Sequence, residues 1–185
     1  FCLPGGIRKP SGIGFATLHN VTVGDDCCIE NVKNYIANYE IGHDTFIENV
    51  DIILTDCVSS FGNGVEVSVL SETGGREVMI FDNLTAQTAY VMALYRHRPE
   101  MVSRLRGMIE AYVESVSSSV GTIGSNSVIV DSGYIKNVKI GDFCKIEGAS
   151  RLKNGSINSN AIDPIYIGNG VMAKNFILSS GSQVT

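Results

Sequence analysis

The chain has 185 residues, of which 44% are hydrophobic and 18% are charged, and it carries a net charge of −5. This composition is that of an ordinary globular domain, and the negative charge argues against a general affinity for nucleic acid or anionic membranes. No apolar run approaches the roughly 20 residues that cross a bilayer, so we expect no membrane partner.

The five cysteines are odd in number and form no Cys-x-x-Cys pair. The sequence therefore predicts neither a disulfide framework nor a metal site, and a reducing cytoplasm fits it best. The chain begins with Phe1 and not with methionine. We expect it to be part of a longer protein with other domains.

Residues 23–53 carry an apolar residue at every sixth position, a period that neither a helix nor a simple alternating strand produces. A glycine comes directly after an apolar residue of this series at Gly24 and again at Gly42, 18 residues later. Three hexads therefore make one coil. Alternate side chains of a short strand point to opposite faces, so the apolar residue and the residue two positions before it should both face the axis of the coil. The apolar series is Val23, Ile29, Tyr35, Ile41, Ile47 and Ile53.

The second inward position is cramped, and small residues fill it after each glycine-containing turn. This position assigns two of the cysteines a structural role as small buried hydrophobic residues. The acidic residues Glu30 and Glu48 lie along exposed corners and predict solvated faces, because an oxygen-ligand cation site needs several converging ligands. The small inward residues are Cys27, Thr45, Ser127, Cys144 and Val171.

Residues 81–119 lose the six-residue period. From Met101 to Val116 the apolar residues follow the spacing of an amphipathic helix, and Pro99 suits its first turn. An earlier helix, over residues 84–97, should end before Pro99, with Asp82 or Asn83 as its N-cap. We expect a helical hairpin inserted between coils.

The six-residue pattern returns in residues 120–185, where Ile-Gly pairs occur at Ile123, Ile140 and Ile167. We expect Ile129 to face the axis of the coil, as Ile29, Ile41 and Ile47 do. The predicted fold is mainly β: one parallel β-helix domain over residues 1–185. Its parts are N-terminal coils (1–80), a helical hairpin insertion (81–119) and C-terminal coils (120–185).

The Val/Ile-Gly-x-x-small hexads resemble those of the bacterial hexapeptide-repeat proteins, transferase-like proteins with a left-handed parallel β-helix. The resemblance implies a left-handed coil of hexapeptide repeats and a homo-oligomer, with a trimer favoured. More narrowly, residues 61–67, 74–78 and 95–99 resemble an uncharacterised family of larger bacterial proteins of unknown function. That second resemblance implies no activity.

Hexapeptide acyltransferases are similar to one another in using a histidine base beside a groove that holds acyl-CoA between subunits. On this resemblance His43, in a turn beside Asp44, is the first catalytic candidate and His19 the second. A turn histidine without a chemical task explains the same residues, because adjacent side chains on a strand usually point apart.

Arginines gather at the corner of the predicted helical hairpin. Arg96 and Arg98 flank it, and Arg76 follows a pair of glycines. They form a candidate anion site for phosphate or carboxylate. A solvated helix face and a hairpin turn are the alternatives.

Two functional hypotheses follow. The first is a noncatalytic domain that serves as an oligomerisation or structural scaffold in a larger transferase-like protein. The alternative is an acyltransferase using acyl-CoA and a sugar-type acceptor at a subunit interface, or the β-helix part of a sugar-phosphate nucleotidyltransferase. A nucleotidyltransferase head would need a glycine-rich phosphate loop that leads into a helix, and the sequence contains none.

Overall fold

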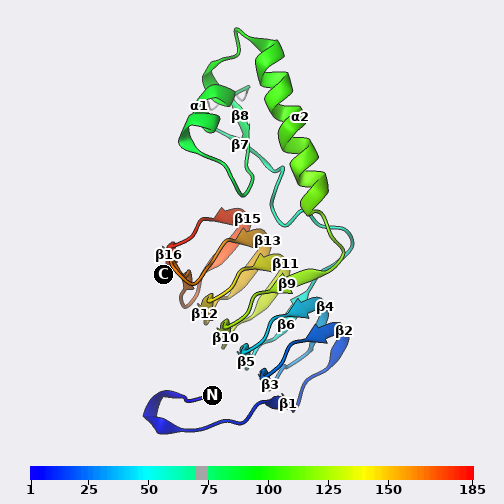
Figure 1. Ribbon diagram of the computed structural model, residues 1–185, viewed down its shortest axis with the longest axis vertical. Helices are drawn as coiled ribbons and strands as arrows, with labels where there is room; N and C mark the ends of the chain where they lie inside the picture. The colour runs from blue at the N-terminus through cyan, green and yellow to red at the C-terminus, as the bar shows by residue number, and fades with distance from the viewer. Residues whose placement is uncertain (70–74) are drawn as a thin grey trace.

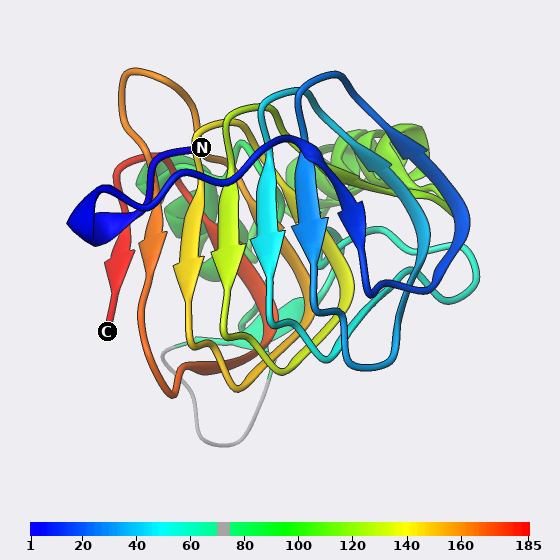
Figure 2. The same ribbon diagram turned by 90° about the horizontal axis from the view of Figure 1, so that it is seen from below.

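The structure is a computed structural model and describes residues 1–69 and 75–185. It is mainly β, with two seven-stranded parallel sheets, and the chain runs back and forth between them (Figures 1 and 2). The first sheet has the order β1-β3-β5-β10-β12-β14-β16, and the second β15-β13-β11-β6-β4-β2 with β9 beside β4 and β11. We call the two sheets together the column. No helix in the described ranges is long and apolar enough to cross a membrane.

The strands of the column are mostly short. Those of the first sheet are β1 (Gly12–Gly14), β3 (Cys28–Glu30), β5 (Phe46–Glu48), β10 (Val128–Val130), β12 (Lys145–Glu147), β14 (Tyr166–Ile167) and β16 (Gln183–Val184). Those of the second are β2 (Leu18–Val23), β4 (Tyr35–Ile41), β6 (Ile52–Leu54), β9 (Gly121–Ile123), β11 (Tyr134–Ile140), β13 (Arg151–Ile157) and β15 (Met172–Leu178).

Isoleucines fill the space between the two sheets. Ile47 lies opposite Ile129 on the neighbouring strand, and both side chains are fully buried. The prediction that Ile29, Ile41, Ile47 and Ile129 face inward is confirmed, since none is more than 3% exposed. The small inward residues Cys27, Thr45, Ser127 and Cys144 are also buried, and Val171 packs against the same core.

The prediction that Tyr35 faces inward is wrong. Tyr35 is 36% exposed, whereas the next residue, Ile36, is fully buried. The corner between β3 and β4 contains one residue more than the period allows, with Asn31 in the left-handed conformation (φ 55°). The inward position therefore moves by one residue, and the phenol of Tyr35 remains at the surface.

Residues 65–69 and 75–117, which we call the arm, form a separate small unit that extends away from the column (Figure 1). The antiparallel strands β7 (Glu66–Ser68) and β8 (Glu77–Met79) pack with the helices α1 (Ala86–Leu94) and α2 (Pro99–Val116). Their shared core consists of Val78, Met79, Met92, Ala93 and Ile109. The division at residues 80 and 120 that we drew from the sequence stays a prediction, but the β7–β8 hairpin packs with the helices.

The predicted first helix, over residues 84–97, is too long at both ends. The N-cap is Thr85, whose Oγ1 accepts a hydrogen bond from the Thr88 amide at 3.2 Å. Asp82 is not the cap, because its carboxylate accepts hydrogen bonds from Tyr112 and Asn158. Pro99 lies in the first turn of α2, as predicted.

The arm is inserted within a single layer of the column. The first half of β4 pairs with β6, which precedes the arm, and the second half pairs with β9, which follows it. The long strand β11 pairs with the same two strands from the other side. The insertion therefore leaves the stacking of the sheets intact.

Candidate functional site

The N-terminal segment, residues 1–9, lies across the outer face of the first sheet (Figure 2). Cys28 and Phe46 point outward from that sheet, because Ile29 and Ile47 beside them point inward. Both outward side chains are nevertheless buried. Phe46 is covered by the segment, since the ring of Phe1 lies 5.2 Å from its ring.

Lys9 of this segment is held by two carboxylates and an aromatic ring. Its Nζ lies 2.7 Å from Glu30 Oε2 and 2.5 Å from Glu48 Oε1, and 5.8 Å from the centroid of Phe46. The two glutamates are directly opposite each other on β3 and β5. Two like charges in this position repel, so a cation between them stabilises the pair. The hydrogen bonds that Lys9 donates to Glu30 and Glu48 raise the pKa of Lys9.

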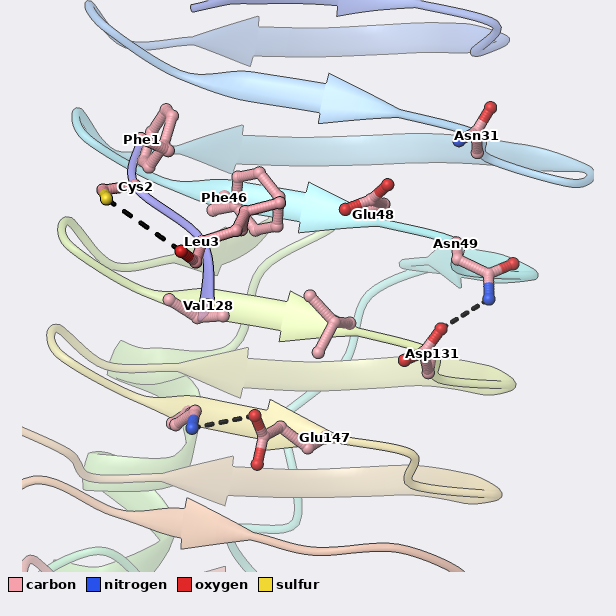
Figure 3. Close-up of a pocket in the computed structure, with 12 residues that line it drawn as sticks. Phe1, Cys2, Leu3, Asn31, Phe46, Glu48, Asn49, Val128, Asp131 and Glu147 are labelled. Atoms are coloured by element: carbon pink, nitrogen blue, oxygen red, sulfur yellow. Dashed lines mark hydrogen bonds and ion pairs between the residues drawn. The ribbon is translucent and has the colours of Figure 1, made fainter. Parts of the chain in front are cut away.

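A groove of about 730 Å³ opens beside the segment, along the same face (Figure 3). The apolar part of its lining includes Phe46, Val128 and Val130. Its polar side chains come from the strands β5 and β12 (Glu48, Lys145 and Glu147) and from the corners after β5 and β10 (Asn49 and Asp131), with Asn31 at one end. It is thus an amphipathic groove with an acidic side.

The charges of this groove are partly paired. Lys145 Nζ lies 2.8 Å from Glu147 Oε1, and this hydrogen bond lowers the pKa of Glu147. Asn49 donates a hydrogen bond to the carboxylate of Asp131. The lysine thus neutralises one of the carboxylates that line the groove.

His43 and Asp44 lie at the exposed corner between β4 and β5. His43 Nδ1 is 2.6 Å from Asp44 Oδ2, and both side chains are more than half exposed. The expectation that these adjacent side chains point apart is therefore wrong. His19 lies on a different element, the edge strand β2, and is exposed. A catalytic role for either histidine stays a prediction.

The predicted anion site falls on the arm. Arg96 Nη2 lies 3.8 Å from Glu77 Oε2, and Arg98 is the exposed residue just before α2. The hydrogen bond from the backbone N–H of Gly75 is the main cause of a lowered pKa of Glu77, and the charge of Arg96 adds to it. Arg76 precedes β8, while Gly74, its neighbour in the predicted motif, lies outside the described residues. An anion site here stays a prediction.

A buried polar cluster, which we call the junction, joins the arm to the column. Asn63, only 2% exposed, donates to Ser60 O at 3.0 Å and to Ser156 Oγ at 3.3 Å. Its Oδ1 accepts from the Asp82 amide at 2.8 Å, and Ser156 Oγ donates to Phe61 O at 2.8 Å. Ser156 belongs to β13, so these bonds connect both ends of the β7–β8 hairpin to the second sheet.

The junction extends through Asp82. Its two carboxylate oxygens accept hydrogen bonds from Asn158 Nδ2 at 3.1 Å and from Tyr112 OH at 2.9 Å. Burial, together with the carboxylate of Asp82, raises the pKa of Tyr112 to about 12. Gly62 (φ 85°) is required here, since a Cβ would lie 2.8 Å from Phe176 O.

Comparison with known proteins identifies the family. Residues 1–185 match the family described as "Domain of unknown function (DUF4954)". The chain belongs to this DUF4954 family. A relative from Treponema pallidum (strain Nichols), described as "Uncharacterized protein", is 31% identical over 186 residues, which cover 95% of this chain and 26% of the relative. No solved structure matches.

The DUF4954 domain therefore spans about a quarter of the length of that relative. The resemblance to the transferase-like hexapeptide-repeat proteins is wrong, because the family that matches the whole chain is one of unknown function. The left-handed coil that the resemblance implied has no support in these comparisons.

Two features of the DUF4954 domain were missed from the sequence, namely the junction and the capture of Lys9. A signal for the second was present. Outside the arm the dipeptide Ile-Glu recurs at residues 29–30, 47–48 and 146–147, each time at the end of a short strand of the first sheet. The isoleucine predicts the inward direction, so the glutamates had to form a row on the outer face.

Proposed function

We propose that this DUF4954 domain is a noncatalytic scaffold, in which the two sheets are faces of one parallel β-helix that holds the arm in a fixed position within a longer protein. The junction is the observation that carries this proposal. Buried polar groups are costly unless they are hydrogen-bonded, so the bonds of Asn63 and Ser156 favour one placement of the arm.

The column supports the same function. Its axis is filled with side chains, and each strand depends on the strands above and below it. A stack of this kind is a rigid support rather than a moving part. The insertion of the arm within one layer, between β6 and β9, adds a projecting unit without breaking the stack.

We also propose that the scaffold associates with itself. The outermost strands of the two sheets are β1 and β16, and β2 and β15. Strands at the edge of a sheet present backbone groups that can pair with another chain. The trimer rested on the resemblance that proved wrong, and light scattering of the purified chain is the measurement that gives the oligomeric state.

Hydrogen exchange tests the role of the junction. We expect Asn63→Ala to speed amide exchange in α1 and α2 by about tenfold or more, while β10 to β13 exchange as in the wild type. Asn34→Ala, which removes an exposed side-chain hydrogen bond to Asp51 within the column, is the matched control and should leave exchange in the arm unchanged. Unchanged exchange in the arm of Asn63→Ala would contradict the proposal.

Calorimetry with acetyl-CoA tests the noncatalytic part. We expect no heat of binding with the wild-type chain. Binding that is lost in His43→Ala would contradict a purely structural role, because the His43–Asp44 pair has the geometry of an oriented imidazole.

A further inference from the structure

We propose that the groove on the outer face of the first sheet binds an extended peptide segment that carries a lysine or arginine beside apolar residues, and that the N-terminal segment occupies one end of this site. The groove lies on the first sheet and the junction on the second, so this proposal does not rest on the scaffold function.

Lys9 shows the chemistry of recognition. Carboxylates from two neighbouring strands and the face of an aromatic ring surround one ammonium group. Ion pairs and a cation–π contact together select a basic side chain with an apolar stem. The residues that provide these groups belong to the column, and only the bound lysine belongs to the segment.

The groove continues the same two rows of outward side chains. Phe46 and Val128 are neighbours in one row, and Glu48 and Val130 are neighbours in the other. Further along, Glu147 extends the second row. An extended segment that crosses the strands advances by about 3.3 Å per residue, so it passes one strand, about 4.8 Å, every one to two residues.

The N-terminal segment already binds in this manner at one end. Phe1 packs against Phe46 on β5, and Leu3 lies near Val128 on β10 (Figure 3). Apolar side chains of the segment therefore contact the apolar row, while Lys9 contacts the acidic row. A partner segment with the same two kinds of side chain fits the rest of the groove.

The charge of the groove favours a basic partner. Three carboxylates line it, those of Glu48, Asp131 and Glu147, against the single ammonium group of Lys145. Lys145 pairs with Glu147 and Lys9 pairs with Glu48, so among the described residues Asp131, which accepts a hydrogen bond from Asn49, is the one of the three carboxylates without a cation beside it. Glu48 can receive a cation from a partner when the segment that carries Lys9 is displaced. Complementary charge of this kind gives selectivity and faster association.

Fluorescence anisotropy with a defined peptide tests the proposal. The probe is a labelled, acetylated peptide with the sequence of residues 1–10 and serine in place of the cysteine. In the full 185-residue chain the internal segment competes with it. We expect Lys9→Ala to bind the probe about tenfold more tightly than the wild type, because the internal competitor is weakened.

Two controls make the result specific. Lys33→Ala, at an exposed corner outside the groove, should bind the probe as the wild type does. Adding Glu48→Gln to Lys9→Ala should weaken binding about tenfold, as should replacing the lysine of the probe by norleucine. Equal binding by Lys9→Ala and the wild type, or binding insensitive to Glu48→Gln, would overturn the proposal.

Two further measurements distinguish binding of a peptide partner from exchange of the segment between copies. Alkylation of Cys28, followed by mass spectrometry, reports displacement of the segment, because this buried thiol points outward from β3. The extent of alkylation should be higher in Lys9→Ala than in the wild type. Light scattering of Lys9→Ala separates a peptide partner from a second copy. Dimerisation of this variant without binding of the probe would show exchange of residues 1–9 between copies, and would overturn the proposed partner.

Discussion

The column and the arm bury their apolar residues in different ways. In the column, the same kind of side chain returns at each layer, and Ile29, Ile47, Ile129 and Ile146 form a continuous row of fully buried neighbours. In the described part of the arm, a small core of five buried residues lies between one hairpin and two helices. Stability is therefore shared along the column but local in the arm.

This difference explains why the arm needs the hydrogen bonds of the junction. A unit with a small core is marginal by itself, because it buries too little apolar surface to offset its conformational entropy. The arm gains additional order from its hydrogen bonds to β13 and to Asn158. The predictions below separate the two regions by replacing equivalent residues in each.

Truncation of a buried isoleucine should give the largest effect. Ile129→Ala should lower the free energy of unfolding by about 2–5 kcal/mol, because it leaves a cavity within the row of the column. The matched variant Ile109→Ala removes the same atoms from the core of the arm. Urea unfolding followed by hydrogen exchange should show loss of protection in both regions for Ile129→Ala, but in the arm alone for Ile109→Ala.

Replacement of glycine by alanine should lower the stability of the column and raise that of the arm. A Cβ at Gly124 would lie 2.3 Å from the backbone nitrogen of Asp142 in the next layer, so Gly124→Ala should destabilise the column by about 1–3 kcal/mol. Gly107 lies on the exposed face of α2 with nothing within 4 Å. Gly107→Ala should stabilise the arm by about 0.5–1 kcal/mol, measured by thermal unfolding, because alanine favours the helix. Equal effects would contradict the close stacking of layers.

Removal of the N-cap of α1 should have an effect of about 1 kcal/mol. Thr85→Ala leaves the amide of Thr88 without its side-chain acceptor, whereas Thr85→Ser keeps the hydroxyl and should be close to the wild type. The loss should appear as faster exchange in the first turn of α1. Exchange in β4 and β11 should remain unchanged.

Alkaline titration should distinguish a tyrosine of the column from one of the junction. Burial raises the pKa of Tyr39, whose hydroxyl donates to Val138 O at 2.8 Å, and that of Tyr112, each to about 12. Because both values are raised from 10.0, the stabilisation is complete below pH 10 and is lost as the pH rises towards 12. Tyr112→Phe should remove one late-titrating group from the absorbance of tyrosinate and leave the contribution of Tyr39.

The sequence predicted the column better than the junction, and the reason is physical. A stacked fold repeats its inward positions at a fixed interval, so Ile29, Ile47 and Ile129 could be assigned from spacing alone. Corner length varies independently of that interval, which is why Tyr35 was misassigned. The hydrogen bonds of Asn63 join residues far apart in the chain, and no local spacing encodes such contacts. The spacing of the Ile-Glu dipeptides predicts the row of glutamates, but not that Lys9 binds there.

Methyl NOE spectroscopy on isoleucine-labelled protein tests the central claim most directly, namely that the column continues unbroken past the inserted arm. The chain places Ile47 before the arm and Ile129 after it, and the structure makes them direct neighbours on β5 and β10. We predict a methyl–methyl NOE between Ile47 and Ile129, continuous with NOEs from Ile29 to Ile47 and from Ile129 to Ile146. An absence of the Ile47–Ile129 NOE while the other two are present would contradict the account.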